Sequence, residues 1–400
     1  MRVALVLKQL DPRRGGAEQW TTQFAAALVQ RGHEVHVVAQ RFGEQVGHLS
    51  IVAHPVRRVR SRLAFAEAAQ AKLMAIAPDI IHDMGVGWYC DVFHPHAGSW
   101  ASVTERKLRL VAPWLRPLKQ RVDRWLPRQR EYRTLVSRQY ADNGQIMLAL
   151  SETAADDFRR FHGVPSERIR IVYNGVDTVR FSPEHRGLHR RAVRRRLGVS
   201  DETVLALIVA HNFRLKGLPA LLGAMSRLTA ERVPLHLAVV GGKHLRPWEW
   251  TARRLGLGGS VSFLGAVDDT VPYYAAADLY VHPTFYDMCS LVVLEAAASG
   301  LPILTTRING VSELLTQGTE GLLISDPADV DELTDRMRAL FDESLRLKMA
   351  RAARQMALRH TLKRNVDEIL DVYEEVIEMR RPAVSRKPPA RPPVGTAWKV

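Results

Sequence analysis

Two carboxylates bracket a short segment that begins polar and turns apolar. Asp287 and Glu295 lie at its two ends, within the run TFYDMCSLVVLEAAASGLP at 284–302. The spacing predicts a loop followed by the start of a helix near Ser290, with Asp287 before the helix and Glu295 about two turns into it. Because ionised carboxylates accept hydrogen bonds from hydroxyl groups, the pair suits a ligand with hydroxyls at two places, such as the sugar and the ribose of a sugar nucleotide.

The start of this predicted helix could also hold a phosphate group. The first backbone amides of a helix, here those of Ser290, Leu291 and Val292, have no partners within it, and the helix dipole favours negative charge at that end. We therefore expect these three residues to contact a phosphate. The alternative for both acids is a plainer role, as stabilisers of the helix start or as surface charges.

Two further loops carry groups that bind phosphates. After the first apolar run, Gly15 and Gly16 open a predicted helix, and glycines let backbone amides approach an anion closely at a helix N-terminus. A tight turn that caps the helix is the alternative. In the run HNFRLKG at 211–217, Arg214 and Lys216 are separated by a single residue. Both cations can converge on one diphosphate, although a solvated charged loop has the same composition.

A histidine adds a candidate catalytic group. His96 lies in the run DVFHPHAGSW at 91–100, close to Gly98 and Ser99. A loop that contains glycine can bring such a side chain to a substrate, and a structural role is the alternative. The two cysteines are far apart and form no C-x-x-C motif, so the sequence predicts neither a metal site nor a disulfide framework, and it fits a reducing compartment.

The loops described above need elements that position them. Short apolar runs alternate with helical patterns, and runs that are apolar throughout are typical of parallel strands buried on both faces. The layout therefore predicts an α/β fold with two doubly wound, Rossmann-like domains. Such sheets bind ligands beyond the carboxyl ends of their strands, where these loops lie. The predicted strands are 3–7, 35–38, 80–82, 147–151, 204–210, 235–240, 261–264, 279–282 and 303–305.

The chain length and its turns predict how the domains are divided. A chain of 400 residues suits two domains better than one core. The turn-rich run YNGVDTVRFSP at 173–183 separates the two series of strands. We predict domains at 1–175 and 176–360, with a helix at about 361–379 that packs back on the first. The basic, proline-rich end at 381–400 is expected to be a disordered tail.

Taken together, these motifs resemble the retaining glycosyltransferases of family four, which have the two-domain GT-B fold. The resemblance rests on the order and spacing of the GGAE loop at 15–18, the NGVD linker at 174–177, the R-x-K-G loop at 214–217, the VVGG turn at 239–242 and the EAAASGLP helix at 295–302. It covers about residues 1 to 375. It implies that the first domain binds the acceptor, that the second binds the nucleotide sugar, and that the two face each other across a cleft.

The resemblance also implies roles for individual residues. Arg214 and Lys216 would bind the donor diphosphate, Glu295 the ribose, and Gly16 the donor phosphate or the acceptor. The first acid of the family pattern is usually glutamate, so Asp287 departs from it, and the shorter side chain could change which donor sugar fits. Members of the family keep the anomeric configuration and need neither a metal nor a cofactor. The predicted catalytic residues are Asp287 and His96; the predicted donor-binding residues are Gly15, Gly16, Arg214, Lys216, Gly241, Ser290, Leu291, Val292 and Glu295.

The net charge of +15 indicates that the protein has an anionic partner. Ten lysines and arginines against three acids lie at 105–133, interleaved with apolar residues at helical spacing, and Pro113 and Pro117 predict two short helices there. Basic helices with tryptophans on an apolar face bind anionic lipid, and the segment resembles the membrane-associated segment of lipopolysaccharide-core glucosyltransferases in this family. An ordinary amphipathic helix packed on the domain is the alternative. The residues expected at the membrane are Trp114, Arg116, Lys119, Arg121, Arg124 and Trp125.

A second basic cluster at 189–196 is interpreted as a solvated helix face.

The resemblance predicts the transfer of a hexose from a nucleotide sugar, a UDP-sugar above all, to a lipopolysaccharide-core or other glycolipid acceptor. The enzyme would be cytoplasmic and peripheral on the inner face of the cell membrane, because its first residues include neither a signal-peptide core nor a membrane span.

The sequence also allows other functions. A sugar-nucleotide epimerase or a phosphorylase-like enzyme could share the fold, although no cofactor lysine for a phosphorylase is apparent. The charge also admits a nucleic-acid-binding protein, but none of the usual reading motifs is present, so nucleic acid is not an expected partner. The sequence leaves the oligomeric state open.

Overall fold

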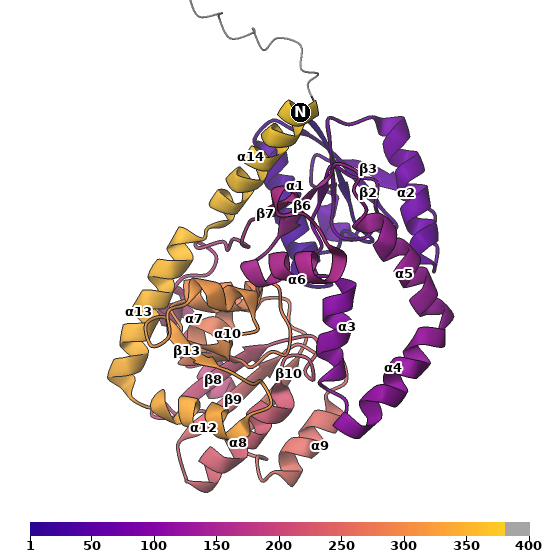
Figure 1. Cartoon of the computed structure of the whole chain (residues 1–400). Helices are drawn as coiled ribbons and strands as arrows, with labels where there is room; N and C mark the ends of the chain where they lie inside the picture. Colours follow the sequence, from indigo (N-terminus) through magenta and orange to yellow (C-terminus); the bar gives the residue numbers. More distant parts are fainter. Residues whose placement is uncertain (381–400) are drawn as a thin grey trace, which may run out of the picture.

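The computed structural model describes residues 1–380, apart from the side chains of Arg124 and Pro127. Its elements form two halves, each built on a parallel sheet with helices packed against it (Figure 1). The predicted α/β class with two doubly wound sheets is therefore confirmed. The predicted disordered tail at 381–400 lies outside the described residues.

The first sheet has seven parallel strands in the order β3-β2-β1-β4-β5-β6-β7. Val3 of the central strand β1 packs in a buried cluster with α1, whereas its neighbour Ala4 packs in another cluster with α2. The sheet is thus covered on both faces, which explains the unbroken apolar run of β1. The elements of this half are β1 (Arg2–Val6), α1 (Gly16–Gln30), β2 (Glu34–Ala39), β3 (Val52–Pro55), α2 (Arg62–Ile76), β4 (Ile80–Asp83), β5 (Val92–Phe93), β6 (Ile146–Ala149), α6 (Glu152–His162) and β7 (Ile169–Ile171).

The second sheet has six parallel strands in the order β10-β9-β8-β11-β12-β13. Its central strand β8 alternates in the same way: Ala206 packs in a cluster with α8, and Leu207 packs in a cluster with α10 and α11. The elements of this half are α7 (His185–Leu197), β8 (Val204–Val209), α8 (Leu218–Ala230), β9 (Leu235–Val240), α9 (Arg246–Arg254), β10 (Val261–Gly265), α10 (Val271–Ala276), β11 (Leu279–His282), α11 (Leu291–Ala298), β12 (Ile303–Thr306), β13 (Gly321–Ile324) and α12 (Val330–Ala339).

In each sheet the strand order reverses at one place, between β1 and β4 in the first and between β8 and β11 in the second. Loops that leave two such neighbouring strands diverge, and they open a crevice at the carboxyl ends of the strands. Gly16 follows β1, Lys216 follows β8 and Asp287 follows β11. The sequence motifs therefore lie at the two reversal points.

The last two helices connect the halves. After α13 (Glu343–Arg359), α14 (Leu362–Arg380) runs back along the first half and lies beside α1 (Figure 1). The indole N–H of Trp20 on α1 donates to Oδ1 of Asn365 on α14 at 2.9 Å, and both side chains are buried. Tyr373 of α14 lies in the same buried cluster as α1, so the end of the described chain is part of the core of the first half.

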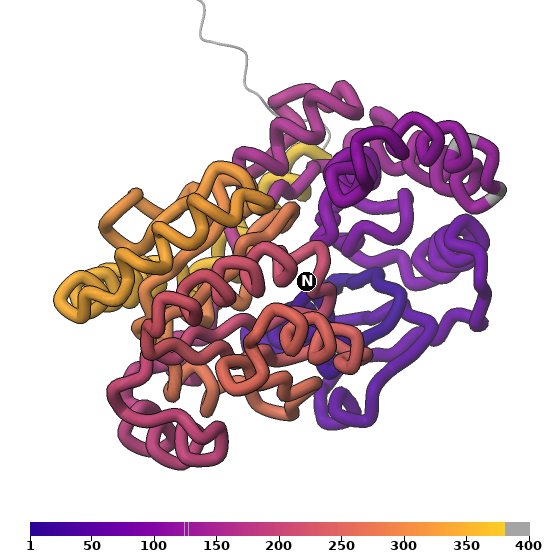
Figure 2. The backbone as a smooth tube through the Cα atoms, turned by 90° about the horizontal axis from the view of Figure 1, so that it is seen from below, coloured from indigo at the N-terminus to yellow at the C-terminus, as the bar shows by residue number. Residues whose placement is uncertain are grey.

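A segment of three helices projects from the side of the first half. It consists of α3 (Trp100–Leu108), the 3₁₀ turn η2 (Pro113–Leu115), α4 (Arg116–Trp125) and α5 (Pro127–Gln139). Figures 1 and 2 show this segment on the opposite side of the molecule from α13 and α14. Pro113 begins the 3₁₀ turn and Pro117 lies in the first turn of α4, positions where proline removes no helical hydrogen bond. The predicted interruption by the prolines therefore occurs before α4.

The interpretation of 189–196 as a solvated face holds for Arg191, Arg195 and Arg196, which are exposed, but it is wrong for two other arginines of the cluster. Arg190 and Arg194 of α7 point inward and pair with Asp278, at 2.8 and 2.9 Å, and Arg186 joins them at 3.0 Å. Arg194 is only 2% exposed, and its guanidinium also donates to the carbonyl of Ala276, the last residue of α10, at 3.3 Å. The Asp278 carboxylate, which no local pattern in the sequence reveals, pairs with this basic helix face. The face therefore has a structural role.

Candidate active site

A partly buried ion pair joins the two loops at the reversal point of the second sheet. Nζ of Lys216 donates to Oδ2 of Asp287 at 2.5 Å and to the carbonyl oxygen of Tyr286 at 3.2 Å. Nε2 of His282, at the end of β11, lies 3.6 Å from the same carboxylate oxygen. Burial alone would raise the pKa of Asp287, but Lys216 and His282 hold that pKa well below its usual range. Asp287 is therefore ionised at neutral pH.

The backbone of both loops is held in place. The amide of Phe285 donates to the carbonyl of Leu215 at 2.9 Å, and the amide of Gly310 donates to the carbonyl of Asp287 at 2.9 Å. Gly217, with φ of 75°, lies so close to Pro283 that a Cβ atom would overlap the Pro283 carbonyl oxygen. These contacts fix the position of the Asp287 carboxylate relative to Lys216.

The start of α11 faces the start of α1 across the two halves. Leu291 is the first residue of α11, and a Cβ atom on Gly16 would lie 3.2 Å from its Cδ1. Ser290 precedes α11, and its buried hydroxyl oxygen has no hydrogen-bond partner among the described residues. Since buried hydroxyls are normally satisfied, this oxygen is free for a ligand that lies between the two helix starts.

Glu295 lies on α11, close to the same place. It is the fifth residue of the helix, so it stands little more than one turn in, not two as predicted, because the helix begins at Leu291. Its Oε2 accepts from the Tyr274 hydroxyl at 2.9 Å. Burial raises the pKa of Glu295 to about 7, although the hydrogen bond from Tyr274 opposes the shift.

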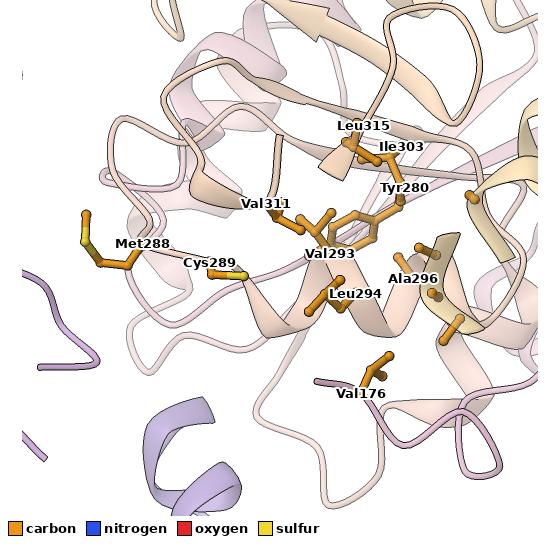
Figure 3. Packing of buried hydrophobic residues seen from close by; sticks show 14 of the residues in the cluster. Val176, Tyr280, Met288, Cys289, Val293, Leu294, Ala296, Ile303, Val311 and Leu315 are labelled. Carbon is orange, nitrogen blue, oxygen red and sulfur yellow. The ribbon is translucent and has the colours of Figure 1, made fainter. Parts of the chain in front are cut away.

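The apolar face of α11 anchors this site. Val293, Leu294 and Ala296 are fully buried, and Figure 3 shows them beside Tyr280 of β11, Ile303 of β12 and Val311. Residues on both sides of Glu295 are thus locked in the core. The helix cannot turn or slide without breaking that packing, which fixes the direction of the carboxylate.

The remaining predicted donor-binding residues lie around the same crevice. Arg214 is exposed and forms no ion pair with the residues that the structure describes, so it can turn toward an incoming anion. Gly241 follows β9 with φ of 99°, and a Cβ atom there would overlap the carbonyl oxygen of Ala210 at the end of β8. Gly15 precedes α1 as its N-terminal cap.

His96 stands at the end of a row of buried aromatic rings. The ring of His82 lies between Tyr373, whose hydroxyl is 2.6 Å from Nδ1, and His94, whose Nδ1 is 3.2 Å from Nε2. The His96 ring packs against those of His94 and Trp20, with centroids 4.1 and 4.5 Å apart. Burial lowers the pKa of His96 to about 3, so the ring is neutral. Its Nε2 is buried without a partner among the described residues.

The loop after His96 meets the loop of Asp287. Gly98 has φ of 76°, and a Cβ atom there would overlap the Tyr286 hydroxyl and press on the sulfur of Met288. Tyr286 and Met288 are the residues on either side of Asp287. The first half therefore contacts the second directly at the candidate site.

A cavity of about 560 Å³ lies on the other side of Gly98. It lies between the carboxyl ends of the first sheet and the helices α3 to α5 and is open to solvent on one side, and we call it the α3–α5 cavity. Lys107, Lys119 and Arg128 belong to the basic cluster at 105–133, which the sequence linked to lipid and not to a cavity, whereas Lys8 and Arg62 were not singled out. The cations in its lining are Lys8, Arg62, Lys107, Lys119 and Arg128, and the acid is Asp123.

The residues predicted to meet a membrane lie on η2 and α4, and Lys119 among them also lines the α3–α5 cavity. Trp114 and Trp125 are 78% and 71% exposed, and Leu118 and Val122 between them are also exposed. Arg121 is exposed as well, Lys119 pairs with Asp123 at 2.9 Å, and Arg116 donates to the carbonyl of Val111 at 3.0 Å. The side chain of Arg124 lies outside the described residues. None of the helices described combines the length and apolarity needed to cross a membrane.

No cluster of three metal-binding side chains occurs in the described part of the chain. His185 and His189 do stand four residues apart on α7, a spacing that can hold a metal ion, with ring centroids 6.0 Å apart. Within residues 1–380 they have no third ligand nearby.

Two family models match the chain. The model described as Glycosyltransferase Family 4 matches residues 14–180, and the one described as Glycosyl transferases group 1 matches residues 203–343. Among curated proteins, the D-inositol 3-phosphate glycosyltransferase of Corynebacterium jeikeium (strain K411) is 29% identical over 62% of this chain and 62% of its own length. The lipopolysaccharide glucosyltransferase WaaG of Escherichia coli (strain K12) is 30% identical over 53% of this chain and 57% of its own length. The chain thus spans about three fifths of the curated relatives it matches.

Solved structures resemble the chain over nearly its whole length. A crystal structure of WaaG, a glycosyltransferase involved in lipopolysaccharide biosynthesis, matches with a TM-score of 0.78 at 24% identity over 93% of this chain and 99% of that one. A structure of Anabaena Alr3699/HepE in complex with UDP and glucose matches with a TM-score of 0.68 at 19% identity, over 94% of this chain and 99% of that one. At these identities the likeness establishes the fold of the chain.

Proposed function

Because the chain belongs to the GT-B glycosyltransferases of family four, we propose that it transfers a hexose from a nucleotide sugar, a UDP-sugar above all, to a glycolipid acceptor and keeps the anomeric configuration. One observation carries the proposal: the ion pair of Lys216 and Asp287 lies at the reversal point of the second sheet, beside the start of α11 and opposite Gly16. This is where a doubly wound sheet binds a nucleotide. Bound UDP and glucose in a structure with the same fold also support it.

The donor phosphates would lie between the two loops and the helix starts. Lys216 and Arg214 would hold the diphosphate by charge-assisted hydrogen bonds, and the amides of Leu291 and Val292 would add the favourable end of the helix dipole. The free hydroxyl of Ser290 is placed to donate to the same group. The two basic side chains and the helix start would then stabilise the negative charge that the leaving diphosphate gains, without a metal ion.

Glu295 would bind the ribose. Its Oε2 accepts one hydrogen bond from Tyr274, which leaves lone pairs on the carboxylate for the two ribose hydroxyls. Because it lies on the locked helix α11, its carboxylate stays in a fixed direction, as a specific binding group requires.

Asp287 and His96 would contact the sugar that is transferred. Asp287 stays ionised and accepts from sugar hydroxyls, while the neutral His96, with a free Nε2, exchanges a hydrogen bond with another hydroxyl. Neither is proposed as a nucleophile. Instead, the acceptor hydroxyl attacks the anomeric carbon on the face that the diphosphate leaves, and its proton passes to the leaving phosphate oxygen. The new bond then has the configuration of the old one.

The acceptor is proposed to be a lipopolysaccharide-core or other glycolipid. The exposed tryptophans of η2 and α4 stand among basic residues, as in helices that lie on anionic lipid. With α4 on the lipid, the enzyme would sit as a peripheral protein on the cytoplasmic face of the membrane, within reach of an acceptor anchored there. The name of WaaG, a lipopolysaccharide glucosyltransferase, agrees with this choice.

A donor screen tests the proposal. The purified chain is incubated with UDP-, GDP- and ADP-hexoses, with and without detergent-dispersed lipopolysaccharide-core acceptors, and nucleotide release is measured. We expect release with one or more UDP-hexoses that rises when the acceptor is added. Turnover of the donor without any acceptor, to an epimerised nucleotide sugar, would instead favour an epimerase. No turnover together with tight, salt-dependent binding of duplex DNA would contradict the proposal.

A further inference from the structure

Three of the five cations that line the α3–α5 cavity come from three different elements. Lys8 follows β1, Arg62 begins α2 and Arg128 is the second residue of α5. Burial lowers the pKa of Lys8, and the nearby charges of Arg62 and Arg128 lower it further. Lys8 therefore lies close enough to Arg62 and Arg128 for both charges to act on it.

The acids around these cations are already engaged. Oε1 of Glu131 accepts from the Ser61 hydroxyl at 2.7 Å and from the amide of Leu63 at 3.0 Å, which caps the start of α2. Asp123 pairs with Lys119 at 2.9 Å. Among the described residues, no carboxylate lies within ion-pair distance of Lys8, Arg62 or Arg128. Glu131 is the acid whose charge acts on Lys8, and its carboxylate is already held at the start of α2. Three cations thus face one engaged acid, and this excess of positive charge favours the binding of an anion.

One of the three cations is held in a fixed direction. The guanidinium of Arg62 lies over the ring of Tyr132 on α5, 4.2 Å from its centroid. This contact orients its donors and ties the start of α2 to α5. Because Arg128 also stands on α5, an anion held by all three side chains would join the projecting helices to the core of the first half.

The cavity is large enough for a sugar-sized ligand and reaches the candidate site. Its volume falls in the range of small-molecule pockets, and it has apolar walls that include Phe93, Leu135 and Tyr140. Its lining also includes Pro95, Ala97 and Gly98, the residues around His96. Gly98 contacts Tyr286 and Met288, the neighbours of Asp287. A ligand in the cavity would thus lie next to the place where the hexose is transferred.

We propose that the α3–α5 cavity binds the acceptor and that Lys8, Arg62 and Arg128 hold a phosphate group that the acceptor carries. The inference rests on the proposed function and specifies its acceptor as a phosphorylated sugar or glycolipid. A phosphate fits better than a carboxylate, because cations from three directions can each donate to a different oxygen of a tetrahedral anion. The apolar walls would cover the carbon skeleton next to the phosphate.

The test compares phosphorylated and unphosphorylated ligands on three variants. Lys8→Gln and Arg128→Gln each remove one cation of the cavity, and Arg130→Gln is the matched control, since Arg130 is exposed on the same helix as Arg128 and does not line the cavity. In the first arm, calorimetry measures binding of glucose 6-phosphate and of glucose in the presence of saturating UDP, which occupies the donor phosphate site. In the second arm, KM is measured for a glycolipid core acceptor before and after enzymatic removal of its phosphates.

We expect the phosphorylated form to bind more tightly in at least one arm. Lys8→Gln and Arg128→Gln should each weaken its binding by about tenfold or more, the loss typical of one hydrogen bond to a charged group, and Arg130→Gln should behave as the wild type. An effect in both arms indicates that the phosphate alone is recognised, and an effect in the second arm only indicates a lipid-linked phosphate.

Two outcomes would overturn the inference. One is equal binding of phosphorylated and unphosphorylated forms in both arms, and the other is an equal loss in Arg128→Gln and Arg130→Gln. Because the first arm needs no turnover, it still reports on the cavity if no donor is found. Lys8 and Arg128 stand on different elements, so one variant remains informative if thermal melting shows that the other is unfolded.

Discussion

The ammonium group of Lys216 lies 2.5 Å from the carboxylate of Asp287, although 70 residues separate the two in the sequence. Strands β8 and β11 are neighbours in the second sheet, and the loops that follow them bring the two side chains together. The pair therefore links the loop proposed to hold the diphosphate with the loop proposed to hold the sugar. Removal of Lys216 would leave the partly buried Asp287 carboxylate with only His282 beside it, and removal of Asp287 would leave Lys216 with only the carbonyl of Tyr286.

Asp287 is expected to set the choice of donor sugar. Asp287→Glu keeps the charge and adds one methylene, and the backbone contact between Gly310 and Asp287 keeps the loop in place. We predict an active enzyme whose relative kcat/KM among UDP-hexoses changes, because the carboxylate now reaches a different hydroxyl. Asp287→Asn should lose activity with every donor, by about 100-fold. A donor ranking that is identical in wild type and Asp287→Glu would argue against this role.

Glu295 is expected to make donor binding depend on pH. Its pKa is about 7 in the folded protein, above the usual 4.5, so the folded state holds the proton more strongly. The contribution of this group to the free energy of unfolding therefore falls as pH rises from 4.5 to 7. Above 7 the ionised form accepts both ribose hydroxyls, so KM for the donor should fall as pH rises from about 6 to about 8.

The glutamine variant is the control for this pH effect. Glu295→Gln cannot ionise, so its KM for the donor should be raised about tenfold and should no longer change with pH. Steady-state kinetics at several pH values measure both quantities. A wild-type KM that does not vary with pH, or a variation that persists in Glu295→Gln, would exclude Glu295 as its cause.

The contact between Gly98 and Tyr286 can be tested with a pair of glycines. Both Gly98 and Gly144 have φ near 77°, but only a Cβ atom on Gly98 would meet the second half; at Gly144 nothing lies within 4 Å. Gly144→Ala should cost about 1 kcal/mol of stability from backbone strain alone. Gly98→Ala should cost more and should also reduce turnover, because it displaces Tyr286 next to Asp287. Equal melting temperatures and equal activities in the two variants would show that the contact has no consequence.

Trp114 of η2 and Trp125 of α4 are expected to anchor the enzyme on lipid. Trp114→Ser with Trp125→Ser should weaken binding to anionic vesicles by about tenfold or more, because two exposed apolar side chains no longer enter the interface. Trp250→Ser is the control, since Trp250 is also exposed, at 58%, but lies on α9 of the other half. Vesicle sedimentation at low salt measures the effect. If the wild type does not sediment, or if the double variant sediments equally well, α4 is not a membrane anchor.

The sequence predicts the fold and the donor loops because their signals are local. All nine predicted strands are present, since each is an apolar run long enough to be buried on both faces. The strands that were missed, β3, β5, β7 and β13, are four residues long or shorter. Three of them lie at or near the edges of their sheets, where only a brief stretch of chain pairs and no apolar run is needed.

Contacts between distant segments could not be predicted. The pairing of Arg190 and Arg194 with Asp278 depends on where α7 packs, so their charges were interpreted as solvated. The cluster of Lys8, Arg62 and Arg128 likewise appears only when three elements meet around a cavity. The start of α11 was placed correctly near Ser290, but the depth of Glu295 within the helix was overestimated.

The central claim, that the crevice beside α11 holds a nucleotide sugar by its diphosphate, is tested most directly by acceptor-dependent nucleotide release in a lysine variant. Lys216→Ala removes the cation that contacts Asp287, and Lys348→Ala removes an exposed lysine of α13 as a control. With the donor that the screen identifies, we predict a rate about 100-fold lower in Lys216→Ala and unchanged in Lys348→Ala. A Lys216→Ala enzyme that releases nucleotide at the wild-type rate would contradict the account.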